Sequence, residues 1–232
     1  PDRADVVLGI YEGIGECARA AGVYVVGGDT VRTTGPLALT VALYGEVHPD
    51  RLLRRAGAKP GDVVAVTGAV GAAAAGLRVL AGDEPVDLSV AAPLVRAHVR
   101  PQARLHAGPA LAAVGVRAGI DVSDGVASEV MHLARASGVE VEIDLGQLPL
   151  HPAAVATFGM VQARDLALTG GEDYELLVAV APGVLGVAQA AVAPHTGLTV
   201  IGRVTGLAAG GRVRYVANGD ALGAPGTGYV AF

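Results

Sequence analysis

Apolar residues recur at two spacings along the chain, and these spacings predict a succession of helices and strands. Runs with helical spacing that end at a glycine or before a proline predict α-helices at 6–21, 72–81, 91–98, 106–114, 126–137 and 184–192. Short runs rich in β-forming residues predict strands at 23–26, 37–47, 62–66, 120–122, 139–143, 174–180, 198–204 and 213–216. Residues 165–171 are expected to form a loop or short turn. The pattern therefore predicts a mixed α/β fold.

One stretch of the chain interrupts this pattern. Charged residues, proline and glycine cluster at 48–60, which is typical of a connector between domains. We expect residues 1–50 to be the remainder of an N-terminal domain and residues 51–232 to form a C-terminal domain. The chain begins at Pro1, directly before a helical pattern, so we expect it to be part of a longer protein.

Composition narrows the class of protein. With 52% hydrophobic and 17% charged residues among 232, the chain is globular and long enough to bury a core. The net charge of -5 and the lack of a basic run argue against a nucleic-acid partner. No apolar run reaches the length of a membrane span. A single cysteine, Cys17, excludes an internal disulfide, suits the cytoplasm, and is interpreted as a structural thiol.

Three short segments repeat one design, in which small residues and an acid follow or precede a strand. They are Gly27-Gly28-Asp29-Thr30, Asp121-Val122-Ser123-Asp124-Gly125 and Gly170-Gly171-Glu172-Asp173-Tyr174. Glycine lets the backbone N–H groups approach an anion, and carboxylates hold Mg²⁺ together with phosphate oxygens. The alternative is that each acid caps a helix or closes a turn.

Within the second segment the two aspartates invite different interpretations. Asp121 stands between Ile120 and Val122 in an apolar strand, where a buried carboxylate needs a partner such as a metal ion. Asp124 is either a metal ligand or the N-cap of the helix at 126–137.

Two further segments have a phosphate-binding interpretation. Thr67-Gly68-Ala69-Val70-Gly71 opens a helix and could cradle phosphate, although close helix–strand packing explains it better, because it lacks the lysine of a P-loop. Arg54 and Arg55 could brace a polyphosphate or form a solvated basic pair. The six histidines show no metal-ligand spacing, and no nucleophile elbow is present.

Taken in order, these motifs resemble those of the thiamine-monophosphate kinase family. The resemblance rests on Gly27 to Thr30 with Arg32, on 55–62, on Thr67-Gly68 with Gly71 and Gly76-Leu77, on Asp121 to Gly125, and on Leu168-Thr169-Gly170-Gly171-Glu172-Asp173-Tyr174-Glu175-Leu176. The last segment is the most specific. The family shares the aminoimidazole ribonucleotide synthetase-like fold, which implies an N-terminal sheet that forms a barrel across a homodimer and a C-terminal mixed-sheet domain with packed helices.

The resemblance implies an activity. The family transfers the γ-phosphoryl group of ATP to thiamine monophosphate, giving thiamine diphosphate, with several Mg²⁺ ions aligning the two anions. The implied ATP-binding residues are Tyr11, Gly28, Asp29, Arg55 and Ser123; the implied metal ligands are Asp29, Asp121 and Asp124; the implied substrate contacts are Glu172 and Tyr229.

The sequence also departs from the family pattern. The family's N-terminal Gly-Asp-Asp metal motif is absent, so the chain resembles an N-terminally truncated member. Two alternatives follow: another ATP-dependent enzyme of the superfamily, such as a purine-pathway synthetase, or a non-catalytic nucleotide-binding remnant.

Overall fold

The computed structural model of this protein describes residues 3–82, 86–217 and 220–223. The chain divides into two compact units, Pro1–Glu46 and Val47–Phe232, and each is described by itself. Across the described ranges, every helix is too short or too polar to span a lipid bilayer. The assignment of residues 1–50 and 51–232 to two functional domains stays a prediction.

The first unit contains one long helix, α1 (Arg3–Ala21). Gly22 follows it with a φ of 68°, and the Val23 amide donates to the Ala18 carbonyl at 2.9 Å. This left-handed glycine ends the helix, as its position in the sequence predicts. The helix predicted at 6–21 is confirmed, and it begins three residues earlier.

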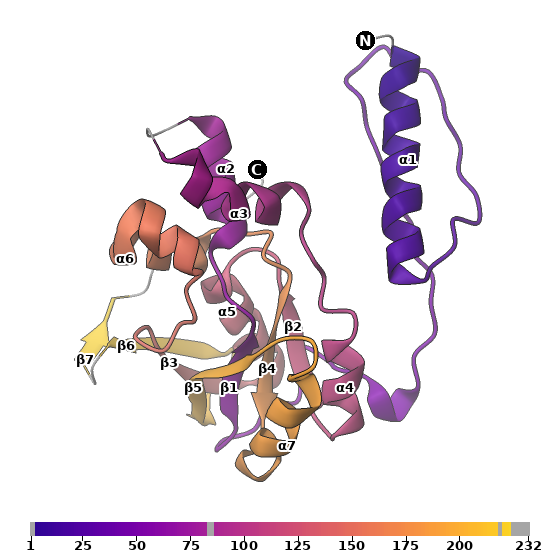
Figure 1. The fold of residues 1–232 in the computed structure, drawn as a ribbon. Helices are drawn as coiled ribbons and strands as arrows, with labels where there is room; N and C mark the ends of the chain where they lie inside the picture. Colours follow the sequence, from indigo (N-terminus) through magenta and orange to yellow (C-terminus); the bar gives the residue numbers. More distant parts are fainter. Residues whose placement is uncertain (1–2, 83–85, 218–219, 224–232) are drawn as a thin grey trace. The chain divides into compact units, whose positions relative to one another are not determined.

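The strands predicted at 23–26 and 37–47 are wrong, because both segments run as connecting chain without strand structure. A strand needs a neighbour to receive its backbone hydrogen bonds. The described part of this unit holds only one helix and the chain that follows it (Figure 1). Apolar side chains that a sheet would cover are therefore exposed: Tyr24 by 91%, Val26 by 94% and Tyr44 by 92%.

The second unit is built on a seven-stranded mixed sheet with the order β2-β4-β1-β5-β3-β6-β7. Its strands are β1 (Val63–Thr67), β2 (Ala118–Val122), β3 (Val139–Asp144), β4 (Glu175–Val180), β5 (Leu198–Leu207), β6 (Arg212–Ala217) and β7 (Asp220–Leu222). All neighbours pair antiparallel except β3 and β6, which pair parallel. The six strands predicted in this part of the chain are confirmed, and β7 is an addition at one edge.

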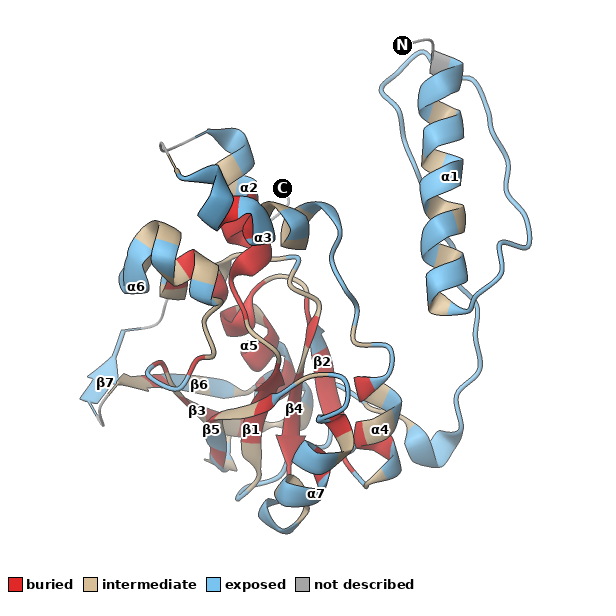
Figure 2. Cartoon of the chain, viewed as in Figure 1, coloured by how far each residue is buried: buried red, intermediate tan, exposed pale blue. Residues whose placement is uncertain are grey.

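Alternating side chains of the central strands supply two separate cores. In β1, Val64 and Val66 belong to one hydrophobic cluster, whereas Ala65 between them belongs to another. In β4, Leu177 belongs to the first of these clusters and Val178 to the second. This follows from the period of two in a strand, which sends successive side chains to opposite faces. The sheet is therefore covered on both sides (Figure 2).

Six helices and one 3₁₀ turn complete the described part of this unit: η1 (Pro49–Arg51), α2 (Ala72–Ala81), α3 (Leu88–Val99), α4 (Ala107–Ala113), α5 (Val126–Ser137), α6 (Pro152–Thr169) and α7 (Pro182–Val192). α5 packs on one face of the sheet, and α4 and α7 pack on the other. α2, α3 and α6 share a third cluster of buried side chains. Gly76 lets α2 and α3 approach closely, since a Cβ there would lie 2.1 Å from the Leu94 carbonyl oxygen.

The loop predicted at 165–171 is wrong over 165–169, which form the end of α6. α6 has an internal break at Gly159, where φ is 78° and ψ is 165°. The break interrupts the helical spacing of apolar residues, so the sequence shows no continuous stripe. The N-terminal signal is present: His151 caps the helix and Pro152 occupies its first turn.

Candidate functional site

In the first unit, the predicted nucleotide-binding residues gather around the turn at 27–30. The Asp29 carboxylate accepts a hydrogen bond from the Thr30 amide at 2.8 Å and is exposed. The Tyr11 hydroxyl lies 3.1 Å from Thr30 Oγ1, and a Cβ on Gly28 would lie 3.6 Å from that hydroxyl. Tyr11, Gly28 and Asp29 therefore come together within this unit.

In the second unit, Asp121, Ser123 and Asp124 lie at the end of edge strand β2. Ile120 and Val122 are buried, but Asp121 between them is exposed. The expectation of a buried Asp121 that needs a partner is therefore wrong, because strand alternation turns its side chain to solvent. The carboxylate remains available to a ligand.

The alternative role of Asp124 as a helix cap is also wrong. The N-cap residue of α5 is Gly125, with a φ of 98°, and no side chain caps the helix. A Cβ on Gly125 would lie 2.6 Å from the Leu168 carbonyl oxygen, so only glycine fits. Asp124 thus precedes the helix without closing it.

A third acid, Glu129, completes this acidic group and was not among the predicted site residues. Only 2% of Glu129 is exposed, and its Oε1 accepts from Ser123 Oγ at 3.4 Å and from the Asp124 amide at 3.3 Å. Burial raises the pKa of Glu129, and the negative charges of Asp124 and Asp121 raise it further. Its place one turn into α5 was the signal that could have revealed it.

The third motif, at 170–174, is bonded directly to the second. The Glu172 amide donates to the Ser123 carbonyl at 2.9 Å, and the Tyr174 amide donates to the Val122 carbonyl at 2.9 Å. Glu172 and Tyr174 both have positive φ, 75° and 51°, which is strained for residues with a side chain. A Cβ on Gly171 would lie 2.2 Å from the Ser123 carbonyl oxygen. The two motifs therefore form one continuous surface.

The side chains of this surface also interact. The Tyr174 hydroxyl donates to Glu172 Oε2 at 3.1 Å. Burial raises the pKa of Tyr174 first, followed by the hydrogen bond to Glu172 and the charges of Glu172, Asp121 and Asp124. The negative charges of Asp121 and Asp124 thus act on Tyr174, and such a field would attract a cation.

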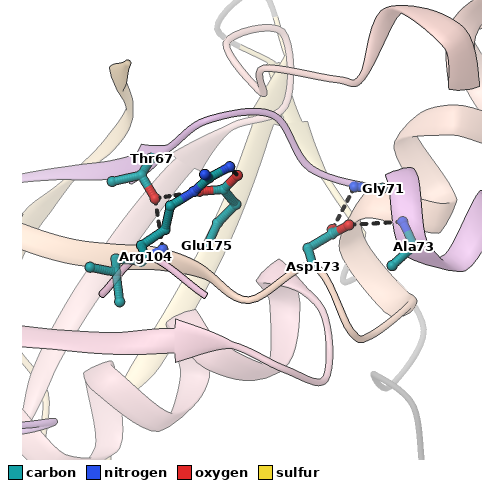
Figure 3. A network of polar contacts seen from close by, with 7 residues as sticks. Thr67, Gly71, Ala73, Arg104, Asp173 and Glu175 are labelled. Carbon is teal, nitrogen blue, oxygen red and sulfur yellow. Dashed lines mark hydrogen bonds and ion pairs between the residues drawn. The ribbon is translucent and has the colours of Figure 1, made fainter. Parts of the chain in front are cut away.

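Two neighbouring acids, Asp173 and Glu175, are bonded to other segments (Figure 3). Asp173 accepts from the Gly71 amide at 2.6 Å and the Ala73 amide at 3.0 Å. It therefore occupies the N-terminus of α2, and the packing interpretation of 67–71 holds in place of a phosphate cradle.

Both carboxylate oxygens of Glu175 accept hydrogen bonds. Arg104 donates to it twice, from Nε to Oε2 at 2.6 Å and from Nη2 to Oε1 at 2.5 Å. The Thr67 hydroxyl donates to Oε2 at 2.6 Å. The hydrogen bond to Glu175 raises the pKa of Arg104 above its usual value. Nothing local in the sequence pointed to Arg104.

A pocket of about 520 Å³ borders this network on the side of Asp173 and Glu175. Arg96, Arg104 and His151 also line it. Ser123 and Glu172 are not among its lining residues, so the pocket lies apart from the surface that the two motifs form.

The remaining predicted residues lie elsewhere. The Arg55 carbonyl accepts from Ser137 Oγ at 3.4 Å, at the C-terminal end of α5, whereas Ser123 and Asp124 precede its N-terminal end. A 12-residue helix is about 18 Å long, so the second unit does not bring Arg55 to them. Tyr229 lies outside the described residues.

Burial of Asp173 gives a pH-dependent prediction. Burial raises the pKa of Asp173 from 3.8 to about 6, against the lowering effect of the Gly71 and Ala73 amides. The protonated Asp173 therefore stabilises the folded state fully below about pH 4. This stabilisation is lost as pH rises through about 6, which lowers the unfolding free energy by about 3 kcal/mol. Urea unfolding at several pH values checks this. The difference in unfolding free energy between wild type and Asp173→Asn should fall over this range and stay constant above it; a constant difference throughout would contradict it.

Comparison with known proteins gives consistent matches. Residues 59–213 match the family model "AIR synthase related protein, C-terminal domain", and residues 1–47 match the corresponding N-terminal domain. The thiamine-monophosphate kinase of Escherichia coli (strain K12) is 41% identical over 184 residues, covering 78% of this chain and 55% of the relative. The chain spans about half the length of the curated relatives it matches.

Two solved structures extend the comparison. Thiamine-monophosphate kinase from Stenotrophomonas maltophilia K279a is 34% identical with a TM-score of 0.63, covering 73% of this chain and 54% of that one. AaThiL complexed with AMPPCP and TMP is 30% identical with a TM-score of 0.60, covering 78% and 54%.

Proposed function

Because the chain belongs to the AIR synthase related protein family, we propose that this protein transfers the γ-phosphoryl group of ATP to thiamine monophosphate, giving thiamine diphosphate. The observation that carries the proposal is the 41% identity to a thiamine-monophosphate kinase over 184 residues. The complex of AaThiL with AMPPCP and TMP supports the same pair of substrates, a nucleotide and thiamine monophosphate.

The geometry of the second unit agrees with a site that binds ATP and thiamine monophosphate side by side. Backbone hydrogen bonds hold Glu172 against Ser123, so a residue proposed to contact thiamine lies beside one proposed to contact ATP. Thiamine carries a positive charge, which a carboxylate such as Glu172 attracts. Tyr229 is proposed to pack on the thiamine as well, and it lies outside the described residues.

Magnesium is proposed as the cation that the site requires. Among the described residues, no three His, Cys, Asp or Glu side chains stand ready to hold a metal ion by themselves. Mg²⁺ at nucleotide sites takes one or two carboxylates and completes its shell with phosphates and water. Asp121 and Asp124, beside the buried Glu129, supply such a donor set, and Asp29 is proposed as a further ligand. When bound, the metal neutralises the phosphates.

The protein's own residues are proposed to bind and orient the two substrates. The acceptor is already a phosphate oxygen, so the transfer requires no strong general base. In the first unit, Gly28 is proposed to contact the nucleotide, with Tyr11 against it. In the second unit, Ser123 is proposed to contact ATP, and Arg55 to brace its phosphates. Since the second unit does not bring Arg55 to Ser123, the two would contact different parts of the bound nucleotide or different nucleotides.

We also propose a cytoplasmic homodimer joined through the first unit. Leu37, Leu39, Val41 and Leu43 alternate along the chain and are each at least 62% exposed. Exposed apolar side chains that lie this close together along the chain fit a surface that a second copy of the protein covers.

The test is to incubate the full-length protein with ATP, Mg²⁺ and thiamine monophosphate and to follow thiamine diphosphate by chromatography. The expected result is product formation that EDTA abolishes. Release of ADP with other acceptors but no thiamine diphosphate would overturn the proposal in favour of another ATP-dependent enzyme. Absence of both would indicate a non-catalytic protein.

A further inference from the structure

Arg104 lies between α3 and α4, in a segment without regular structure, yet it makes a two-bond, largely buried ion pair. Its guanidinium donates two hydrogen bonds to the Glu175 carboxylate, and the two side chains are only 25% and 3% exposed. The Thr67 hydroxyl donates to the same carboxylate and accepts from the Leu176 amide at 2.8 Å. Figure 3 shows these groups converging from three segments.

The Glu175 carboxylate is closely packed on the side of Gly68. A Cβ on Gly68 would lie 2.0 Å from Glu175 Oε1, and Gly68 itself has a φ of 58°. Together, Arg104, Thr67 and the backbone at Gly68 therefore hold Glu175, and the pocket lies on its open side.

Glu175 is the first residue of β4 and directly follows the loop that carries Glu172. In that loop Glu172 and Tyr174 hold strained backbone conformations. Such strain persists only where the surroundings over-determine the conformation. At the α6 end, the Gly170 amide donates to the Leu166 carbonyl at 2.9 Å. At the β4 end, the Asp173 carboxylate and the Tyr174 amide make hydrogen bonds of their own, and the Glu175 carboxylate held by Arg104 follows directly after them.

We propose that Arg104 is a positioning residue for phosphoryl transfer: by holding Glu175, it fixes the loop at 170–174 and so presents Glu172 to the substrate. This inference rests on the proposed function. Arg104 touches neither Glu172 nor, in this proposal, the substrate, and it acts only through Glu175 and the backbone between them.

The requirement is for a guanidinium and not for charge alone. Arginine presents two parallel N–H groups that match both carboxylate oxygens, whereas lysine offers a single point of contact. Arg104→Lys should therefore keep the positive charge beside Glu175 but no longer hold the Glu175 carboxylate in one orientation.

The first experiment is steady-state kinetics of Arg104→Lys in the full-length protein, varying thiamine monophosphate and ATP separately. Misplacement of Glu172 should raise KM for thiamine monophosphate by about tenfold, with KM for ATP within about twofold of wild type. A merely structural role would lower kcat in proportion to the folded fraction and leave both KM values unchanged, which would overturn the proposal. Arg203→Lys, whose side chain is 67% exposed and pairs with Glu142, is the matched control and should change neither KM.

Hydrogen exchange supplies a readout that does not depend on activity. The Glu172 amide donates to the Ser123 carbonyl just after β2, and the Tyr174 amide donates to the Val122 carbonyl at the end of β2, so both should be protected in the wild type. Arg104→Lys should speed their exchange about tenfold or more, while Arg203→Lys leaves it unchanged. Equal protection in the wild type and Arg104→Lys would overturn the proposal even if the kinetics differ.

Glu175→Gln keeps the shape of the side chain and decides the matter if Arg104→Lys does not fold. It should reproduce the rise in KM for thiamine monophosphate, and the double variant should be no worse than either single one, because both act through one contact. Additive effects would overturn the proposal. A wild type without thiamine-monophosphate kinase activity would overturn the proposed function, and the exchange measurements would still decide whether Arg104 fixes the loop.

Discussion

Replacing Glu175 with alanine is expected to destabilise the second unit by about 3–5 kcal/mol, because it leaves the guanidinium of Arg104 without its partner in a largely buried position. The side chain of Glu175 is only 3% exposed and that of Arg104 is 25% exposed, so water replaces little of the lost interaction. Thr67 also loses the acceptor of its hydroxyl. Urea denaturation monitored by circular dichroism measures the change.

The matched control is Glu140→Ala. Glu140 pairs with Arg214 at 2.8 Å, but the Arg214 side chain is 51% exposed, and exposed ion pairs contribute about 1 kcal/mol or less. If Glu175→Ala destabilises the protein no more than Glu140→Ala, the buried pair does not stabilise this unit in the way its geometry indicates.

Replacing Asp121 with asparagine in the full-length protein is expected to lower kcat/KM for phosphoryl transfer by at least about a hundredfold, because the proposed Mg²⁺ ligand loses its charge. The stability of the protein without metal should change by less than about 0.5 kcal/mol, since Asp121 is exposed. Removing its charge also relieves repulsion with Glu129. Kinetics over a range of Mg²⁺ concentrations, together with thermal unfolding with and without Mg²⁺ and ATP, measures both effects.

Asp220→Asn is the control for this variant. Asp220 is also an exposed aspartate on an edge strand, but β7 lies at the opposite edge of the sheet from β2. It should leave kcat/KM unchanged. A loss of stability in Asp121→Asn that matches its loss of activity would mean that Asp121 supports the fold and is not a metal ligand.

The regular elements of the second unit were predictable because their signals are local. The bounds predicted for α2 and α5, 72–81 and 126–137, agree with the structure. Each helix lies between glycines whose positive φ suits a helix end, Gly71 and Gly82 for α2 and Gly125 and Gly138 for α5. α6 escaped prediction because Gly159 breaks the very periodicity from which a helix is inferred.

The first unit shows where local signals fail. The alternating apolar residues at 37–43 have the composition of a strand, yet they form none in the described chain. A strand is completed by a partner, and β-propensity does not supply one.

The sequence by itself determined the types of residue that the site contains: glycines that admit close approach, and the acids of three motifs. The tertiary structure decided which of them meet. It joined Glu172 to Ser123 through the backbone, separated Arg55 from both, and turned Asp173 toward α2. It also paired Arg104 with Glu175 across 71 residues and Thr67 with Glu175 across 108. The physical reason is that a hydrogen bond or ion pair depends on the position of both partners, and for distant segments that position follows from the pairing of strands.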